Sequence, residues 1–224
     1  MRKAKRKKII WSFAILICLF LLAGASALAY LASLAATIPD PTELGNRQIN
    51  QSTKIYDRTG SVLLYEVYGK EKRTIVPLED IPEIARQATI AIEDQSFYEH
   101  SALDFEAVLR AVKNNILKGS FAEGASTITQ QLAKNTFLGP EKTLTRKFKE
   151  LLLALWLEKH YSKDQIIELY LNQIPYGGNA YGIEAASQTY FNKSSKDLKI
   201  EEAAVLASLL RAPSYYSPWG AHLN

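Results

Sequence analysis

The hydrophobic pattern begins with a single long apolar run that follows a basic tail, residues 1–8. No charged residue occurs from Ile9 to Ile38. A helix of this length, at about 1.5 Å per residue, exceeds the roughly 30 Å hydrocarbon core of a bilayer. We therefore predict a transmembrane anchor over residues 9–38. Because basic residues mark the cytoplasmic side, we expect a single-pass protein of the cell membrane with a cytoplasmic N-terminus and an extracytoplasmic body.

A cleaved signal peptide is the alternative reading of this run, because Ala25-Ser26-Ala27 resembles a small-residue cleavage site. The apolar region of a signal peptide is usually about 7–15 residues long. Here the apolar run continues well beyond the site on both sides, which favours a retained anchor.

Residues 39–76 are predicted to form a linker and a β-hairpin. The β-rich runs Lys54–Tyr56 and Val62–Tyr65 flank the sequence Asp57–Gly60, which has the residue types of a turn. Thr74–Val76 is expected to add a further strand.

Residues 77–224 carry helical periodicity and capping signals, so we predict a mainly α domain. The first helix is expected to begin at a capping box, Asp80–Glu83, and to run to about Asp94 with Ile84, Ala88 and Ile92 on its apolar stripe. The further helices expected are 104–119, Ser126 (as cap) to Asn135, Thr143 or Thr145 to His160, Ser162 (as cap) to Leu171, 183–190, and 200–211.

Composition narrows the chemistry. The chain has 224 residues, of which 47% are hydrophobic and 22% charged, with a formal net charge of +4. Six of its 27 basic residues lie in the tail, so the rest carries 21 basic against 23 acidic side chains. The body therefore has no compositional support for nucleic-acid binding. A single cysteine, Cys18, excludes an internal disulfide and a cysteine-based zinc site.

Carboxylates are the acid and base groups that remain. The sequence has no Gly-rich phosphate loop, no GxSxG, SxxK or KTG motif, and only three scattered histidines. Glu93 and Asp94 end a helix after an apolar turn, a setting that disfavours a charged carboxylate and suits a general base. On this feature alone, an exposed helix-terminal pair is the more common outcome.

Glu150 is the second candidate, because it lies among four cations, Lys142, Arg146, Lys147 and Lys149. With Lys134 from the preceding helix, these cations suit a diphosphate leaving group, although a solvated charged face is the usual fate of such a run. Two further segments have unusual polarity: Gly124–Gln131, at a predicted helix start, and Tyr176–Gly182, which reads as a tight aromatic loop.

Five ordered motifs resemble those of the peptidoglycan glycosyltransferases of family 51, found in class A penicillin-binding proteins and monofunctional transglycosylases. They are Glu93 to His100 (EDQSFYEH), Gly124 to Asn135 (GASTITQQLAKN), Arg146 to Glu150 (RKFKE), Lys163 to Asn172 (KDQIIELYLN), and Glu201 to Ser214. This resemblance implies a lysozyme-like helical domain that polymerises lipid II into β-1,4 glycan strands with release of undecaprenyl diphosphate and inversion. The implied partners are lipid II, the growing glycan chain, the membrane and cell-wall synthesis proteins, and no nucleic acid.

The resemblance also implies roles for individual residues. Glu93 matches the general base, and Glu150 matches a catalytic glutamate that assists at the diphosphate through cations or a bound divalent metal (Mg or Mn); no cofactor is obligatory. The positions that match or surround the substrate site are Asp94, Phe97, His100, Ser126, Thr127, Gln130, Gln131, Lys134, Asn135, Lys142, Arg146, Lys147 and Lys149. Residues 108–121 match a segment that dips into the membrane, although an ordinary amphipathic helix is the competing interpretation.

Two departures from the family pattern stand out. Ala102 replaces a common glycine, which would strain a backbone that needs a positive φ, and Lys142 replaces a common arginine, which loses a bidentate fork. Without SxxK and KTG, the chain is either monofunctional or the front piece of a longer protein, and the sequence leaves both open. A lytic enzyme on the same fold and a non-enzymatic cell-wall scaffold are the rival functions.

Overall fold

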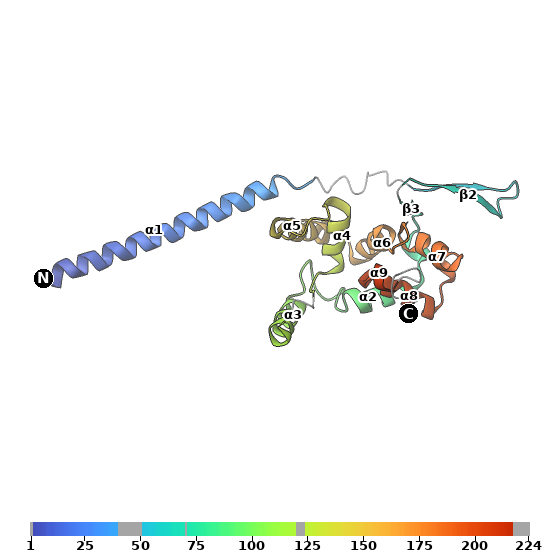
Figure 1. Cartoon of the computed structure of the whole chain (residues 1–224). Coiled ribbons are helices and arrows are strands. Elements are labelled where there is room, and N and C mark those ends of the chain that lie inside the picture. Colours follow the sequence, from blue (N-terminus) through green and yellow to red (C-terminus); the bar gives the residue numbers. More distant parts are fainter. Residues whose placement is uncertain (1, 40–50, 70, 120–123, 217–224) are drawn as a thin grey trace. The chain divides into compact units, whose positions relative to one another are not determined.

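The computed structural model describes residues 2–39, 51–69, 71–119 and 124–216, and these residues are mainly helical (Figure 1). The chain divides into two units, Met1–Pro39 and Asp40–Asn224. The first unit is one helix, α1 (Arg2–Ala35), whose stretch Phe13–Ala35 is long and apolar enough to cross a membrane. The predicted linker residues 40–50 lie outside the described part of the chain.

The second unit begins with the predicted β-hairpin, which the structure confirms. Strands β1 (Thr53–Tyr56) and β2 (Leu63–Val67) pair antiparallel, with Thr53 opposite Val67 and a bulge after Ile55. Asp57 closes the turn, because its Oδ1 accepts hydrogen bonds from the backbone N–H groups of Ser61 and Val62 at 2.9 and 3.0 Å. These contacts are those expected of an aspartate at the start of a turn.

The strand predicted at Thr74–Val76 is wrong by two residues. The strand that forms is β3 (Lys72–Arg73), and it pairs in parallel with β4 (Ala180–Tyr181). Because its partner lies more than a hundred residues away, local β propensity did not locate it. This small sheet joins the segment after the hairpin to the helical body.

The helices of the second unit match the predicted order. The hairpin is followed by a short 3₁₀ turn, η2 (Leu78–Asp80), and a second one, η3 (Ser195–Asp197), precedes the penultimate helix. The α-helices are α2 (Glu83–Glu93), α3 (Phe105–Lys118), α4 (Ile128–Phe137), α5 (Leu144–His160), α6 (Lys163–Gln173), α7 (Ile183–Phe191), α8 (Ile200–Arg211) and α9 (Pro213–Tyr216). Helix α9 was not predicted. The sequence indicated that α8 stops before Pro213, but it gave no sign of a further helix after it.

Local side-chain chemistry sets most helix starts. Asp104 caps α3, and Thr143, one of the two residues proposed, caps α5. Ser162 caps α6 as predicted, and it forms a complete capping box with Gln165. The predicted box at Asp80 is wrong: α2 follows Pro82 without a side-chain cap, and the Asp80 carboxylate instead accepts from Lys196 Nζ at 3.0 Å. The cap of α4 is also shifted by one residue.

The shift at α4 has a clear cause. Thr127 caps this helix by accepting from the backbone N–H of Gln130 at 3.2 Å, whereas the hydroxyl of Ser126 accepts from Lys147 Nζ at 2.7 Å. Both residues are good caps by type, so the tertiary contact with a lysine on α5 decides between them.

The core lies among α4, α5 and α6, and α2 packs against α8. Leu132, Leu153 and Ile166, one from each of the three central helices, are fully buried. On α2 the buried stripe is Ala85 and Thr89, not the predicted Ile84, Ala88 and Ile92, which are half-buried. Since residues four apart share a helix face, the buried stripe continues to Glu93 and turns that carboxylate inward.

Ala102 is fully buried, and its backbone is not strained. Among the described residues, those other than glycine with a positive φ are Asn179 and Asn192. The backbone oxygen of Ala102 accepts hydrogen bonds from Thr127 Oγ1 and Gln130 Nε2 at 3.0 and 3.1 Å. Alanine therefore fits this position without the penalty that a positive φ would bring.

Gly182 provides a test of this architecture. It has a φ of +83°, and a Cβ there would lie 2.6 Å from the backbone oxygen of Asn172 on α6. We expect Gly182→Ala to lower the free energy of unfolding by about 3 kcal/mol or more, because backbone strain and a backbone clash add. Gly60→Ala is the matched control: its φ is +74° with open space around the Cβ, and a loss of about 1 kcal/mol is expected. Urea unfolding of the detergent-solubilised chain measures both, and equal losses would contradict the close approach of α6.

Candidate active site

Glu93, the last residue of α2, has one carboxylate oxygen held and one free. Gln131 on α4 donates from Nε2 to Glu93 Oε2 at 2.5 Å. Glu93 Oε1 is buried and has no hydrogen-bond partner among the described residues. A carboxylate with one oxygen fixed and the other free to accept a proton has the arrangement required of a general base.

Two buried tyrosines lie behind this pair. Tyr170 on α6 donates its phenol to Gln131 Oε1 at 3.1 Å. Burial and the negative charge of Glu93 raise the pKa of Tyr170 well above its ordinary value, and the same causes raise the pKa of Tyr176. Both phenols therefore stay neutral beside the carboxylate.

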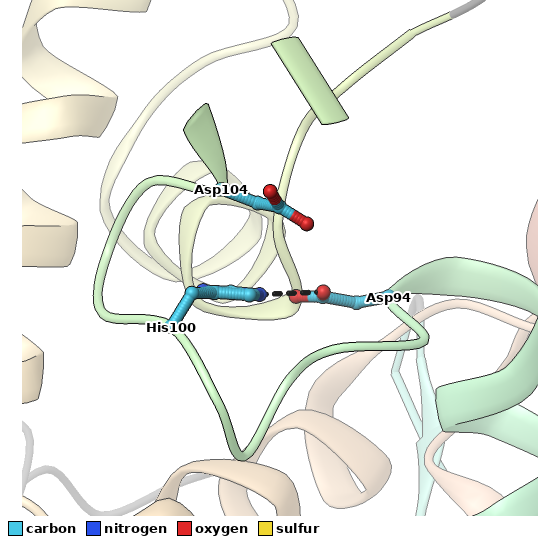
Figure 2. Close-up of side chains that lie close together, drawn as sticks. All are labelled: Asp94, His100 and Asp104. Atoms are coloured by element: carbon cyan, nitrogen blue, oxygen red, sulfur yellow. Dashed lines mark hydrogen bonds and ion pairs between the residues drawn. The ribbon is translucent and has the colours of Figure 1, made fainter. Parts of the chain in front are cut away.

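Asp94, the neighbour of Glu93, is buried and acts within the fold. Its Oδ1 lies 2.6 Å from His100 Nε2, and its Oδ2 accepts from the backbone N–H of Ile128 at 3.0 Å. Figure 2 shows the side chains of Asp94 and His100 end to end, with Asp104 beside them. This network ties the segment after α2 to the first residue of α4, and it thereby fixes Glu93 relative to Gln131.

Asp94, His100 and Asp104 have ligand atoms within 4.8 Å of one another, which is close enough to hold a metal ion. Their oxygens are already engaged, however. Asp104 accepts from Ser96 Oγ at 2.6 Å and from the backbone N–H of Ala107 at 2.8 Å. Hydrogen bonds within the chain thus satisfy this cluster, and its donor set fits the structural network better than a metal site.

Two cavities flank α4. The first, of about 610 Å³, is lined by Glu93, Asp94, Ser126, Thr127 and Gln131 among the residues singled out from the sequence. The second, of about 670 Å³, is lined by Lys134, Asn135, Lys142 and Arg146. Residues of α4 line both cavities: Gln131 lines the first and Lys134 the second. The candidate base and the cations are therefore separated by about one turn of this helix.

The cations lie close enough to repel one another. Burial, and then the charge of Arg146, lower the pKa of Lys134, while the charge of Glu93 acts in the opposite direction. Burial, Arg146 and Lys134 likewise lower the pKa of Lys147. A bound anion would relieve this repulsion, so the cluster has the electrostatics of an anion site.

Glu150 is buried beneath the cations and lines neither of these two cavities. It forms ion pairs with Arg146 and, at 3.0 Å, with Lys147, which are four and three residues before it on α5. Lys147 also contacts Ser126 and Gln130. Since cations occupy both oxygens of Glu150, the residues present do not fit a divalent metal here; they fit a carboxylate that orients two cations.

The remaining predicted residues have different positions in the fold. Phe97 is fully buried in the core, and Lys163 lies over its ring at 4.4 Å. Gln130 is buried between Ala102 and Lys147, and Lys149 is half-buried on α5 and lines neither cavity. The structure thus brings Glu93, Gln131, Lys134 and the α5 cations together, whereas Phe97 and Lys149 stand apart.

Sequence reasoning missed several residues that line the cavities. Arg110 on α3 and Arg211 on α8 line the first cavity. Arg73 lines the second; it pairs with Glu71 at 2.8 Å and lies 5.3 Å from the centre of the Tyr181 ring. Each is a single arginine outside the basic run. The one available signal was Arg211, which directly precedes the Ala212-Pro213-Ser214 end of the fifth motif.

Comparison with known proteins gives the family. A family model described as transglycosylase matches residues 59–223. The chain belongs to the transglycosylase family. This confirms the family expected from the five motifs.

The curated relatives of this transglycosylase chain are much longer proteins. Penicillin-binding protein 1A of Neisseria lactamica is 46% identical over 90% of this chain and 25% of its own length. Penicillin-binding protein 1F of Bacillus subtilis (strain 168) is 51% identical over 76% of this chain and 24% of its own length. The chain therefore spans about a quarter of these relatives. The crystal structure of penicillin-binding protein 1A from Haemophilus influenzae matches 75% of this chain and 15% of that chain at 25% identity, with a TM-score of only 0.35.

The role of Asp94 gives a prediction for this transglycosylase. We expect Asp94→Asn to lower the free energy of unfolding by about 2–3 kcal/mol, because an amide cannot accept from both His100 and the Ile128 N–H. The control is Asp164→Asn, which alters an exposed contact with Tyr98 at 2.9 Å and is expected to cost less than about 0.5 kcal/mol. Denaturant unfolding compares the two. An Asp94→Asn chain as stable as the wild type would show that this network does not hold the fold.

Proposed function

We propose that this chain polymerises lipid II into β-1,4 glycan strands and releases undecaprenyl diphosphate, with Glu93 as the general base. The observation that carries the proposal is the arrangement around α4: Glu93, which has one unpaired carboxylate oxygen, lines one cavity, and mutually repelling cations line the next. A base and an anion site side by side are what a sugar hydroxyl and a diphosphate leaving group require.

The two cavities divide the reaction between them. The acceptor 4-hydroxyl enters the first cavity and gives its proton to Glu93 Oε1. Its oxygen attacks the anomeric carbon of the growing chain from the face opposite the diphosphate. The carbon–oxygen bond to the diphosphate breaks, and the anion departs into the second cavity beside Lys134, Lys142 and Arg146. Attack opposite the leaving group inverts the anomeric carbon.

Glu150 serves the leaving group indirectly in this proposal. By pairing with Arg146 and Lys147 it fixes the positions of two cations that would otherwise separate. A divalent ion that accompanies the diphosphate would add positive charge there, and no step of the proposed reaction depends on it. In the first cavity, Arg110 and Arg211 are placed to meet the diphosphate of the acceptor.

A lytic enzyme is the rival that shares the base. Hydrolysis of a glycan releases a sugar hydroxyl and no diphosphate, so it gives no purpose to the cations of the second cavity. The cluster of Lys134, Lys142 and Arg146 therefore favours the polymerase.

Two features suit a lipid-linked substrate. α1 would anchor the chain in the cell membrane, with the N-terminus in the cytoplasm and the second unit outside. On α3, one face exposes Phe105, Leu109, Val112 and Ile116, at the spacing of a single helical stripe. We propose that this face enters the membrane interface, as the amphipathic pattern allows. Residues 120 and 121 of the expected membrane segment lie outside the described residues.

Replacing the base tests the chemistry. We expect Glu93→Gln to abolish polymerisation of labelled lipid II, because an amide cannot take the hydroxyl proton, while the circular dichroism spectrum stays that of the wild type. Glu83→Gln, at the exposed start of the same helix, is the matched control and should polymerise normally. Electrophoresis of the glycan products decides, and normal chains from Glu93→Gln would refute the base. Shortening of preformed glycan, without growth from lipid II, would support the lytic enzyme.

The cations give a test that depends on pH. Because burial and Arg146 lower the pKa of Lys134 below its ordinary value of 10.5, its charge is present below that lowered pKa and is lost as the pH rises through it. The rate of polymerisation should therefore begin to fall at a pH below 10.5.

In Lys134→Arg the fall in rate should move to higher pH, since arginine stays charged. Lys134→Met should lower kcat by about a hundredfold, and the exposed control Lys159→Met should not; an unchanged pH profile in Lys134→Arg would remove this role.

A further inference from the structure

Gln131, which donates a hydrogen bond to Glu93, also accepts one from Tyr170. Both ends of the Gln131 amide are engaged: Nε2 donates to Glu93 Oε2 at 2.5 Å, and Oε1 accepts from the Tyr170 phenol at 3.1 Å. These three residues come from α2, α4 and α6, so a continuous series of hydrogen bonds runs from the buried core to the Glu93 carboxylate, at Oε2.

The direction of these two hydrogen bonds determines which end of the Gln131 amide faces Glu93. A glutamine amide can present either its NH₂ or its oxygen to a neighbour. If it presented its oxygen to Glu93, two acceptors would face each other, and the carboxylate would lose its support. A phenol that donates to the amide oxygen selects the orientation in which NH₂ faces Glu93. It also polarises the amide and strengthens the second hydrogen bond.

Tyr170 is suited to donate throughout the working range of pH. Its side chain is fully buried. Burial, followed by the charges of Glu93, Tyr176 and Asp94, raises its pKa well above the ordinary value. The phenol therefore keeps its proton, and the direction of the hydrogen bonds does not reverse.

We propose that Tyr170 is a positioning residue, which acts on the reaction only through Gln131 and holds Glu93 so that Oε1 alone faces the acceptor hydroxyl. This inference rests on the proposed role of Glu93 as the base. It assigns Gln131 to the support of the base, whereas the family resemblance implies contact with the substrate. The two roles make different kinetic demands, because support of the base changes kcat while contact with the substrate changes KM.

Variants of the full chain in detergent micelles, assayed with labelled lipid II, separate these roles. Tyr170→Phe removes one hydroxyl, and we expect kcat to fall about tenfold with KM unchanged, because the carboxylate is no longer fixed in its reactive position. Gln131→Met removes both hydrogen bonds at similar volume and should lower kcat by about a hundredfold. The double variant should have the kcat of Gln131→Met, since Tyr170 has no route to Glu93 without the amide.

Tyr190→Phe is the matched control. It also removes one phenol that donates a hydrogen bond, in this case to the backbone oxygen of Tyr176 at 2.9 Å, and it should keep kcat within about twofold of the wild type. Thermal unfolding of all variants is followed in parallel. A loss of kcat in Tyr170→Phe that Tyr190→Phe lacks, at a similar loss of stability, supports the proposal.

Three results would overturn it. They are a Tyr170→Phe chain with the kcat of the wild type, a rise in KM with kcat unchanged in Gln131→Met, and losses in the two single variants that multiply in the double. Glu93→Gln, measured in the same assay, distinguishes a failure of the Tyr170 inference from a failure of the base role of Glu93. If Glu93→Gln is inactive while Tyr170→Phe is normal, only this inference fails. If Glu93→Gln is active, the base role fails, and the inference with it.

Discussion

The site depends on keeping one carboxylate unpaired beside a group of cations. A glutamate this close to Lys134 would lose its capacity as a base if it formed an ion pair, because a bound cation stabilises the charged form. The structure meets this constraint with a neutral partner: the amide of Gln131 holds Glu93. Two of the cations, Arg146 and Lys147, instead pair with a second carboxylate, Glu150, which is buried beneath them. Two glutamates thus take opposite roles because their immediate partners differ.

One short helix makes this separation possible. α4 has ten residues, and it supplies the amide that holds the base and, one turn later, the lysine of the anion site. Its start is fixed twice, by the Thr127 cap and by the Asp94 carboxylate, which accepts the Ile128 N–H. Since Asp94 directly follows Glu93, the same backbone segment sets the position of the base and of the helix that supports it. A small displacement of this segment would therefore move Glu93 and the start of α4 together, and would not separate them.

Much of the fold could be predicted from local sequence patterns. The errors share one cause, which is dependence on residues distant in the sequence. The hairpin, the caps at Asp104, Thr143 and Ser162, and the order of the helices follow from spacing and residue type. The strand at Lys72–Arg73, the cap at Thr127 and the Ala85–Thr89 stripe depend on partners distant in sequence, and local reasoning displaced each by one or two residues. Local patterns also left open whether Glu93 turns inward or ends the helix at the surface. Arg73 and Arg110 carry no local signal, because only the fold brings isolated arginines to a cavity.

If the substrate is lipid-linked, as proposed, α3 would connect it to the site through geometry within one element. Ala107, Arg110 and Ala111 line the first cavity, while the exposed Phe105, Leu109 and Ile116 lie along an apolar stripe of the same helix. A membrane that received the stripe would therefore lie against a wall of the cavity that holds Glu93. Arg110 follows Leu109 directly, so a cation would sit at the level where apolar contact gives way to headgroups. An acceptor whose lipid stays in the membrane would then meet, in order, an apolar face, an arginine and the base. That is the order of lipid tail, diphosphate and sugar along the proposed substrate.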